Sequence, residues 1–199
     1  MKELFKDKTL NKLYLRVERE LGSLPTIKPS KPSEYFFEMV ESIVSQQLSI
    51  KVADTIFGRV RGLVSKKFLP KELLKLSIEE LRGAGLSYSK AAYVQNVAQA
   101  WEEGLVEPTK LEKLSDEEVI EKLVQIKGVG RWTAEMFLMF TLGRPDVFSA
   151  GDYGLKKAIS QAYELPMESK PAVFSELAEQ WSPQRTLASR VLWRSLELA

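Results

Sequence analysis

The sequence predicts an all-α fold, and three observations support this class. Apolar residues recur with helical spacing through most of the 199 residues. No alternation of apolar and polar residues is long enough to form a useful strand. Two Ser-x-x-Glu pairs, Ser77 with Glu80 and Ser115 with Glu118, have the form of capping boxes, which begin helices.

The expected elements follow one another with short connections, and about ten helices are expected in all. A first helix ends before Pro25, Pro29 and Pro32, which predict a stiff linker. Three apolar stripes then predict helices: Phe36, Phe37, Val40, Ile43 and Val44 with Gln47 at the end; Val52, Ile56, Val60 and Leu63; and Ala91, Val94, Ala98 and Trp101. A later helix runs from Thr133 to Leu142 and ends at Gly143–Pro145.

The composition narrows the chemistry that is available. With 44% hydrophobic and 28% charged residues, the chain is expected to bury a core rather than stay disordered. The absence of cysteine excludes disulfides, iron–sulfur clusters and thiolate metal sites. The absence of histidine excludes Ser-His-Asp and Cys-His catalysis. Any catalysis therefore depends on Asp, Glu, Lys, Tyr or a bound ion.

No targeting or membrane segment is expected from the sequence. The charges of the first 21 residues interrupt their apolar positions, which is unlike a signal peptide. No stretch reaches the roughly 18 apolar residues of a membrane span. We therefore expect a protein that is neither secreted nor membrane-bound, cytoplasmic and nucleoid-associated in a prokaryote or nuclear in a eukaryote.

Charge is distributed unevenly although the net charge is +2. Residues 51–93 carry nine Lys and Arg against four Asp and Glu, a balance of +5. Residues 101–122 carry three against eight, a balance of −5. The acidic block is expected to be a solvated face, while the basic block is a weak indication of an anionic partner.

The glycines of Gly128-Val129-Gly130 lie between two predicted helices. Glycine allows a tight turn with positive φ. The turn also exposes successive N–H groups at the start of a helix, where an anion such as a DNA phosphate binds well. Taken alone, however, such a glycine pair more often marks a tight connection between packed helices.

The longer pattern resembles the helix-hairpin-helix superfamily of DNA glycosylases, whose order is hairpin, helix, a loop rich in Gly and Pro, then an aspartate. Here the loop is residues 143–151 and the aspartate is Asp152. Three further segments resemble the 3-methyladenine DNA glycosylase II branch: SIVSQQLS at 42–49, LRGAGLSYSK at 81–90, and a tail with Trp181, Pro183, Arg185, Ala188 and Trp193. The resemblance covers most of residues 34–195. It points to compact, all-helical members, because an N-terminal β domain has no room.

The resemblance implies two helical lobes with DNA bound in the cleft between them. A central lobe, residues 34–149, holds the hairpin. The second lobe combines residues 1–33 with residues 150–199, so that Asp152 lies at the junction. We expect the protein to act as a monomer on double-stranded DNA that contains damaged bases.

The resemblance assigns catalysis to Asp152, while the residue pattern alone assigns it the N-cap of the following helix. The two roles are compatible. A carboxylate beside the sugar stabilises an oxocarbenium ion and orients or deprotonates water. Trp132 occupies the position of the Schiff-base lysine of bifunctional relatives, so we expect no lyase activity. Trp132, Trp193 and Met136 are expected in the base pocket, although core packing is the alternative for Trp132.

Other residues are expected to contact DNA. In the family, the loop containing Gln46, Gln47, Leu48 and Ser49 enters the minor groove, with Gln47 at the wedge position. The alternative for this loop is a polar helix end, with Ser49 capping the next helix. Lys90 is either a phosphate contact or a surface charge. The hairpin contributes further expected DNA contacts, namely Lys127, Gly128, Val129, Gly130, Arg131 and Thr133. Tyr35 and Tyr153 are expected to be packing residues.

No cofactor is expected for catalysis, but the family's hairpin binds a monovalent cation. The corresponding main-chain carbonyls are those of Val124, Ile126 and Val129, which would hold sodium or potassium.

The expected function is hydrolytic excision of alkylated bases such as 3-methyladenine and 7-methylguanine, because cationic bases leave without a general acid. The alternatives are a non-catalytic module that binds damaged DNA, and a bifunctional glycosylase/lyase.

Overall fold

The structure is a computed structural model that describes residues 4–198, and the regular elements in that range are all helical. The chain divides into two compact units. The central unit contains residues 30–142, and the terminal unit joins residues 4–29 to residues 143–198. The expected all-α class is confirmed. Within the described range, the helices are too short or too polar to cross a membrane.

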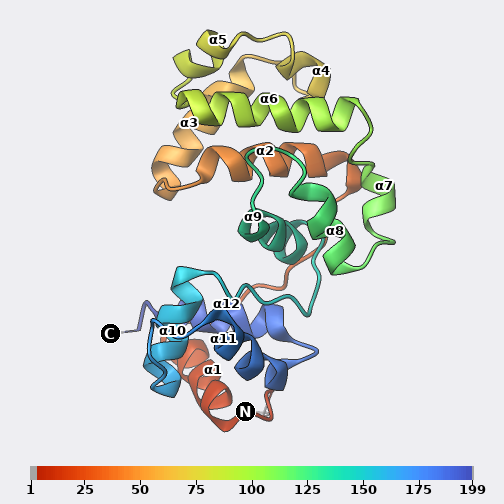
Figure 1. The fold of residues 1–199 in the computed structure, drawn as a ribbon. Helices are drawn as coiled ribbons and strands as arrows, with labels where there is room; N and C mark the ends of the chain where they lie inside the picture. The colour runs from red at the N-terminus through yellow and green to blue at the C-terminus, as the bar shows by residue number, and fades with distance from the viewer. Residues whose placement is uncertain (1–3, 199) are drawn as a thin grey trace. The chain divides into compact units, whose positions relative to one another are not determined.

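In the central unit, α2 (Tyr35–Ser45) and α6 (Tyr88–Glu102) lie side by side, as Figure 1 shows. The centres of their predicted apolar stripes are fully buried, with Val40 and Ile43 on α2 and Val94 and Ala98 on α6, while Phe37 and Trp101 are partly buried. The other elements of this unit are η1 (Pro32–Glu34), α3 (Ile50–Gly62), α4 (Pro70–Leu73), α5 (Ile78–Gly83), α7 (Pro108–Leu111), α8 (Asp116–Leu123), α9 (Arg131–Met136) and a π-helical turn, η2 (Phe137–Thr141).

The two capping boxes predicted from the sequence begin α5 and α8. The Ser77 hydroxyl accepts the Glu80 N–H at 3.2 Å, and the Glu80 carboxylate accepts the Ser77 N–H at 2.8 Å. Ser115 and Glu118 repeat the exchange at 3.3 and 2.7 Å. Each pair satisfies N–H groups that a helix start leaves unpaired.

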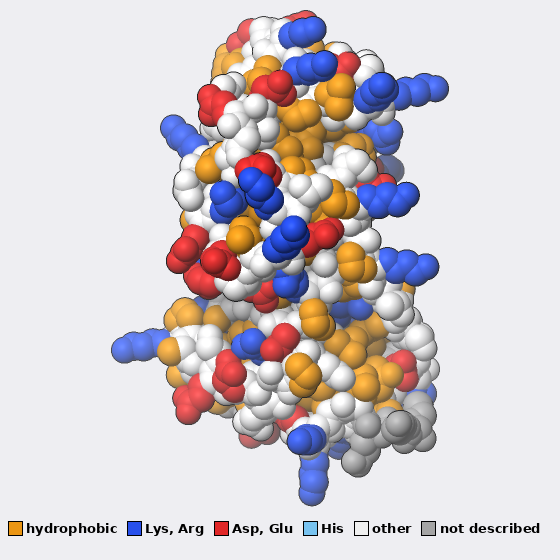
Figure 2. Space-filling model, turned by 90° about the vertical axis from the view of Figure 1, so that its right-hand side faces the viewer, with side chains coloured by type: hydrophobic (Ala, Val, Ile, Leu, Met, Phe, Trp, Pro, Cys, Tyr) orange, Lys and Arg blue, Asp and Glu red, His pale blue; other side chains and the backbone are white. Residues whose placement is uncertain are grey.

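The acidic block at 101–122 is solvated, as expected. Most of its carboxylates, on and around α7 and α8, are exposed. Figure 2 shows one face of the molecule, on which acidic and basic side chains are interspersed.

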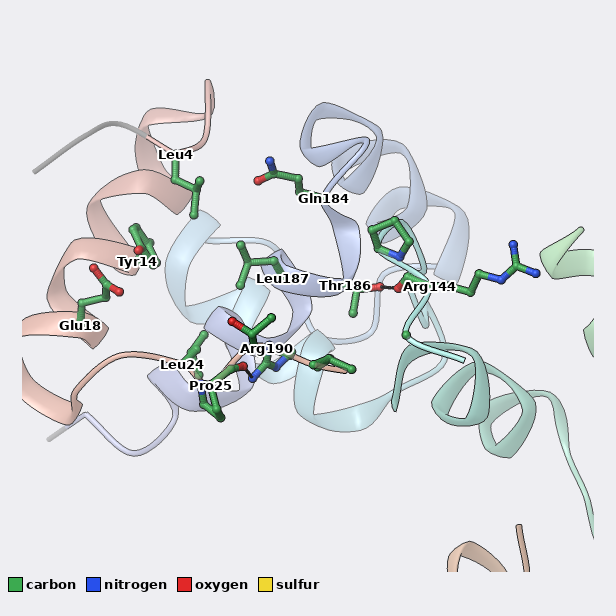
Figure 3. A pocket seen from close by; sticks show the side chains of 14 residues that line it. Leu4, Tyr14, Glu18, Leu24, Pro25, Arg144, Gln184, Thr186, Leu187 and Arg190 are labelled. Atoms are coloured by element: carbon green, nitrogen blue, oxygen red, sulfur yellow. Dashed lines mark hydrogen bonds between the residues drawn. The ribbon is translucent and has the colours of Figure 1, made fainter. Parts of the chain in front are cut away.

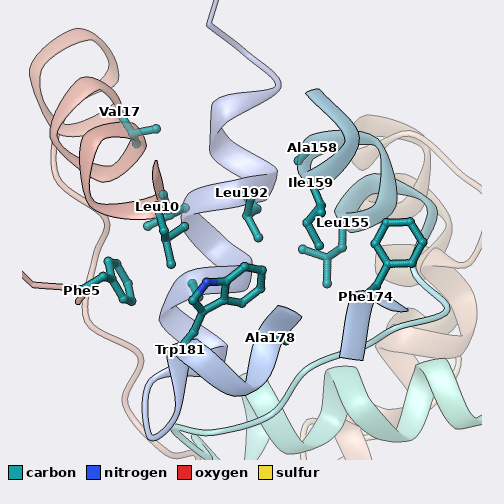
Figure 4. Packing of buried hydrophobic residues seen from close by; sticks show 12 residues of the cluster. Phe5, Leu10, Val17, Leu155, Ala158, Ile159, Phe174, Ala178, Trp181 and Leu192 are labelled. Atoms are coloured by element: carbon teal, nitrogen blue, oxygen red, sulfur yellow. The ribbon is translucent and has the colours of Figure 1, made fainter. Parts of the chain in front are cut away.

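In the terminal unit, helices from both ends of the chain surround one core. These are α1 (Lys8–Leu21), α10 (Tyr153–Tyr163), α11 (Pro171–Ala178), η3 (Glu179–Trp181) and α12 (Arg185–Ser195). Figure 4 shows the indole of Trp181 among side chains from α1, α10 and α12. Trp181 is 2% exposed, so this core depends on residues separated by most of the chain.

Asp7 links the start of α1 to that core. Its Oδ1 accepts the N–H groups of Thr9 and Leu10 at 2.9 and 3.0 Å. Its Oδ2 accepts the Tyr163 hydroxyl at 2.7 Å and the Trp181 indole N–H at 2.9 Å. Burial by itself raises the pKa of Asp7, but these hydrogen bonds outweigh burial and lower the pKa overall.

The central unit begins and ends earlier than the 34–149 expected from the sequence. The segment after Gly143 belongs to the terminal unit because it is hydrogen-bonded to α12. The Thr186 N–H donates to the Pro145 carbonyl at 3.0 Å, and the Thr186 hydroxyl donates to the Arg144 carbonyl at 2.6 Å. Thr186, at the start of α12, therefore joins the segment after Gly143 to the terminal unit.

Candidate functional site

The two glycines of the hairpin between α8 and α9 have different roles. Gly128 has a φ of +108°, and a Cβ there lies 2.2 Å from the Tyr93 ring. Gly130 is the N-cap of α9 with a φ of −88°, and a Cβ there meets nothing within 4 Å. Positive φ and close approach therefore require glycine at 128, whereas neither requires it at 130.

The hairpin leads directly into the start of α9. The Ala134 N–H makes the first backbone hydrogen bond of α9, to the Gly130 carbonyl at 3.1 Å. The amides that precede it are those that a helix start directs toward an anion. The Val129 N–H donates instead to the Ile126 carbonyl at 2.9 Å, so this amide supports the turn. Lys127 is exposed beside it.

The side chain of Arg131, one of the residues expected to contact DNA, is bound by two carboxylates. Its two terminal nitrogens donate to the two carboxylate oxygens of Glu117, each at 2.8 Å, and its Nε donates to Glu135 at 3.0 Å. Hydrogen bonding to Glu117 is the main reason why the pKa of Arg131 is raised. The guanidinium charge is thus offset by two carboxylates, and the residue ties α9 to α8.

The loop after α2 is anchored to the hairpin by Gln46. Its amide nitrogen donates to the Thr133 hydroxyl at 3.2 Å and to the Gly128 carbonyl at 3.5 Å. Thr133 is 3% exposed. The side chains of Gln46 and Thr133, two residues expected to contact DNA, therefore contact each other inside the central unit.

The tip of this loop is exposed. Gln47 has a φ of +56°, which is the left-handed region, and Leu48 is 36% exposed. Ser49 is the N-cap of α3, but its side chain makes no capping hydrogen bond. Gln47 and Leu48 are therefore exposed at the tip, but a left-handed residue directly after a helix is also a common helix end, so the wedge role stays a prediction.

The Lys90 side chain is partly buried and points back into the protein. Its Nζ donates to the Val44 carbonyl at 2.7 Å and to the Gln46 carbonyl. Burial lowers the pKa of Lys90. Both interpretations of Lys90 from the sequence are therefore corrected: its ammonium group binds the end of α2 and the loop that follows.

A cavity of about 510 Å³ in the central unit contains one of the expected pocket residues, Met136. Leu48 of the exposed loop and Phe140 also line it. Phe140 is 43% exposed and belongs to the π-helical turn η2, a local structure frequent at functional sites. Trp132, also 43% exposed, precedes Met136 by one helical turn, so the core-packing alternative for Trp132 is excluded.

The same cavity has an acidic lining. Glu38, Glu41 and Asp54 face it, and its described lining residues include no Lys or Arg. Burial, followed by the charges of Glu38 and Asp54, raises the pKa of Glu41. The described residues contain no group of carboxylates arranged to hold a metal ion.

In the terminal unit, Asp152 is oriented by two donors on one oxygen. The Leu155 N–H donates to Oδ1 at 2.7 Å, which makes Asp152 the N-cap of α10. The indole N–H of Trp193 on α12 donates to the same oxygen at 2.8 Å. The capping role predicted from the sequence is confirmed. Trp193, expected as a pocket aromatic, also holds the carboxylate.

Gly154 leaves room for this arrangement, and its role was not predicted from the sequence. A Cβ at residue 154 lies 3.0 Å from Trp193 Cδ1 and 3.1 Å from Asp152 Oδ1. The available signal was a glycine in the first turn of a predicted helix, where a small residue admits a neighbour. Tyr153 was expected to be a packing residue, but its side chain is 72% exposed, so this prediction is wrong. Tyr35, in contrast, is buried and donates to Glu112 at 3.0 Å.

Comparison with known proteins decides the family. Residues 40–183, most of the chain, match the family model described as "HhH-GPD superfamily base excision DNA repair protein". The chain belongs to the HhH-GPD superfamily. The matched range includes the hairpin and Asp152, whereas Trp193 lies beyond it.

Three relatives of this HhH-GPD chain carry 3-methyladenine in their names. It is 34% identical over 194 residues to DNA-3-methyladenine glycosylase 1 of Schizosaccharomyces pombe, covering 96% of this chain and 85% of the relative. The solved S. pombe 3-methyladenine DNA glycosylase Mag1 in complex with abasic DNA has a TM-score of 0.80 at 33% identity, covering 94% and 92% of the two chains. A DNA-3-methyladenine glycosidase from Bacillus halodurans has a TM-score of 0.80 at 39% identity, covering 97% and 86%.

A second cavity of this HhH-GPD chain lies in the terminal unit and has a volume of about 370 Å³ (Figure 3). Leu24, Pro25 and Leu187 line it, and the Arg190 guanidinium donates to the Pro25 carbonyl at 2.6 Å. Neither Asp152 nor Trp193 is among its lining residues. This cavity is therefore separate from the residues around Asp152.

The carbonyls of Val124, Ile126 and Val129, which the resemblance assigns to a monovalent cation, all belong to this hairpin. The Ile126 carbonyl accepts the Val129 N–H at 2.9 Å and keeps a second lone pair. The bound cation stays a prediction.

Proposed function

We propose that this protein is a monofunctional DNA glycosylase that flips alkylated bases out of duplex DNA and hydrolyses their N-glycosidic bonds. The observation that carries the proposal is Asp152, held by Leu155 and Trp193 in a chain of the HhH-GPD superfamily. The names of the relatives support 3-methyladenine as a substrate type. We add 7-methylguanine because it is also a cationic alkylated purine.

Asp152 is the group that acts on the sugar. As the base departs, positive charge develops on the sugar ring, and a nearby carboxylate stabilises it. The same carboxylate orients or deprotonates the attacking water. Because Oδ1 accepts two hydrogen bonds from the protein, the carboxylate is held in one orientation before substrate binds.

Hydrolysis without strand cleavage is supported by Trp132. An indole cannot form the Schiff base that a lyase step requires. Lys127 is exposed on the hairpin, five residues away along the chain. Borohydride reduction in the presence of abasic DNA should therefore trap no covalent adduct, and a trapped complex would contradict the monofunctional assignment.

The acidic cavity favours a cationic substrate. DNA is a polyanion, so carboxylates weaken its binding unless they meet a positive group. Glu38, Glu41 and Asp54 line the cavity together with Phe140, and an aromatic face attracts a cation. The volume of about 510 Å³ lies within the range of small-ligand sites. Bases that carry a positive charge after alkylation, such as 7-methylguanine, match this lining.

The hairpin is proposed to hold a DNA phosphate at the start of α9. A sodium or potassium ion on the carbonyls of Val124, Ile126 and Val129 would add positive charge next to that phosphate. Titration of DNA binding with sodium, potassium and lithium at constant ionic strength tests this part. Equal affinities in all three salts would argue against a specific ion.

Base release from randomly methylated duplex DNA, with the products identified by chromatography, tests the function. We expect release of 3-methyladenine and 7-methylguanine by the wild type and none by Asp152→Asn. The alternative is a non-catalytic protein that binds damaged DNA. That alternative predicts tight binding to abasic DNA by both forms and base release by neither.

A further inference from the structure

We infer that Lys90 is a positioning residue that holds the loop of residues 46–49 in the conformation required for base flipping. The inference rests on the proposed glycosylase function and adds a role that is distinct from the chemistry at Asp152. It follows from the contacts of Lys90, from the backbone of Gln47 and from the second anchor at Gln46.

The contacts of Lys90 are with the backbone at the end of α2. Its Nζ donates to the carbonyls of Val44 and Gln46, at positions where a helix end leaves carbonyls unpaired. A cation at this end also offsets the partial negative charge of the helix terminus. Two of the three ammonium protons are thus committed to the loop, which leaves the group poorly suited to a phosphate contact.

Lys90 is itself held in place by the start of α6. Ser87 is the N-cap of this helix, and its hydroxyl accepts the Lys90 N–H at 3.2 Å. The lysine side chain lines a pocket of about 270 Å³ together with residues 46–48 of the loop and residues 85–87 of the preceding turn. Lys90 therefore connects the exposed loop to the rigid body of α6.

The loop needs such anchors because Gln47 is not glycine yet has a φ of +56°. A side chain disfavours this region, so the conformation persists where the surroundings determine it. Lys90 fixes the Gln46 carbonyl on one side, and the hairpin fixes the Gln46 amide on the other. Gln47 and Leu48 remain exposed between these anchors.

An ordered loop lowers the cost of inserting into DNA, because its conformational entropy is lost during folding rather than during binding. Without the Lys90 contacts, the loop has to be ordered while the base is flipped. Removing the Lys90 contacts should therefore slow base flipping and leave the rate of the hydrolysis step at Asp152 unchanged.

The variant Lys90→Met keeps most of the aliphatic chain and removes the donors, while Lys90→Arg keeps charge and donors. Lys122→Met is the matched control, because Lys122 donates to a backbone carbonyl, that of Leu105, at 3.1 Å in the same unit. If Lys90→Met fails to fold, Lys90→Gln replaces it. Melting temperatures establish that the compared variants are folded.

Single-turnover excision of 7-methylguanine is measured in two duplexes. In the paired duplex the 7-methylguanine lies opposite cytosine, and in the unpaired duplex it lies opposite an abasic position, so that flipping costs less free energy. We expect Lys90→Met to lose about tenfold or more in the paired duplex, the scale of hydrogen bonds to a charged group. The loss should be several-fold smaller in the unpaired context. Lys90→Arg should recover most of the paired rate, and Lys122→Met should match the wild type in both. Equal losses of Lys90→Met in the two duplexes would overturn the inference.

Fluorescence of 2-aminopurine placed next to the lesion reports loop insertion whether or not a base is released. If the wild type releases no base, the proposed function fails, and this signal still tests Lys90. We expect a smaller fluorescence increase for Lys90→Met than for the wild type at saturating protein. The same increase for both proteins would overturn the positioning role.

Discussion

Replacing Asp152 by asparagine separates the two roles that this residue combines. Oδ1 accepts both the Leu155 N–H and the Trp193 indole N–H. The carbonyl oxygen of asparagine can accept the same two hydrogen bonds, and asparagine is as good an N-cap as aspartate. The substitution therefore removes the negative charge while it preserves the local hydrogen bonding.

The expected magnitudes follow from this geometry. Because the cap is retained, the free energy of unfolding should change by less than about 1 kcal/mol. Loss of an electrostatic stabiliser of the transition state lowers rates by at least ~10²-fold, or about 2.7 kcal/mol of activation free energy. Asp152→Ala, in contrast, removes the cap as well and should cost about 1 kcal/mol of stability in addition to the rate.

The assay is single-turnover release of 7-methylguanine at saturating enzyme, next to a thermal melt and an abasic-DNA binding isotherm of the same sample. We expect Asp152→Asn to melt and bind like the wild type and to release base at least ~10²-fold more slowly. An asparagine variant that turns over at nearly the wild-type rate would refute the assignment of Asp152. A variant that is slow because it is unfolded would refute the geometric argument instead.

Other substitutions test the remaining contacts. Trp193→Phe keeps an aromatic ring but removes the 2.8 Å hydrogen bond to the carboxylate, and we expect base release to slow by about tenfold or more. Gly130→Ala should melt within a few degrees of the wild type, because a Cβ there meets no neighbour, and should bind all duplexes more weakly. Gly128→Ala should lose stability, because a Cβ there clashes with the Tyr93 ring. Thermal melts and DNA-binding isotherms of the same samples will measure both effects. Glu41→Gln should slow release of cationic bases several-fold and leave neutral bases unaffected in a competition assay. Asp7→Asn should lower the free energy of unfolding by about 1–3 kcal/mol at neutral pH, since one amide oxygen cannot serve four donors. Folding lowers the pKa of Asp7, so the stability difference between the wild type and Asp7→Asn is fully present above about 3.9, the pKa of Asp in the unfolded chain. The difference should vanish as the pH falls through the lower pKa of Asp7 in the folded protein, and thermal melts at a series of pH values will measure it.

Local signals made much of the fold predictable. The capping boxes at Ser77 and Ser115 involve residues three apart, and the stripe from Val40 to Val44 follows one helix face. Such patterns need no knowledge of distant partners. The N-cap role of Asp152 is predictable for the same reason.

Partners far apart in the sequence were not predictable from it. Lys90 meets a carbonyl 46 residues away, Gln46 meets Thr133 87 residues away, and Trp193 meets Asp152 41 residues away. A polar side chain has several possible partners, and the fold selects among them. Arg131 shows the consequence, because its position in the hairpin suggested DNA while Glu117 and Glu135 hold its charge.

The dependence of the terminal unit on both ends of the chain has a consequence for synthesis. The central unit contains all of residues 30–142 and can fold as soon as they leave the ribosome. Asp7 has to wait for Tyr163 and Trp181, which emerge more than 150 residues later. Trp193, the partner of Asp152, comes later still. A nascent chain that stops before α12 therefore contains the whole hairpin but lacks the Trp193 indole that binds the Asp152 carboxylate, so the proposed DNA contact can form before the proposed catalytic site.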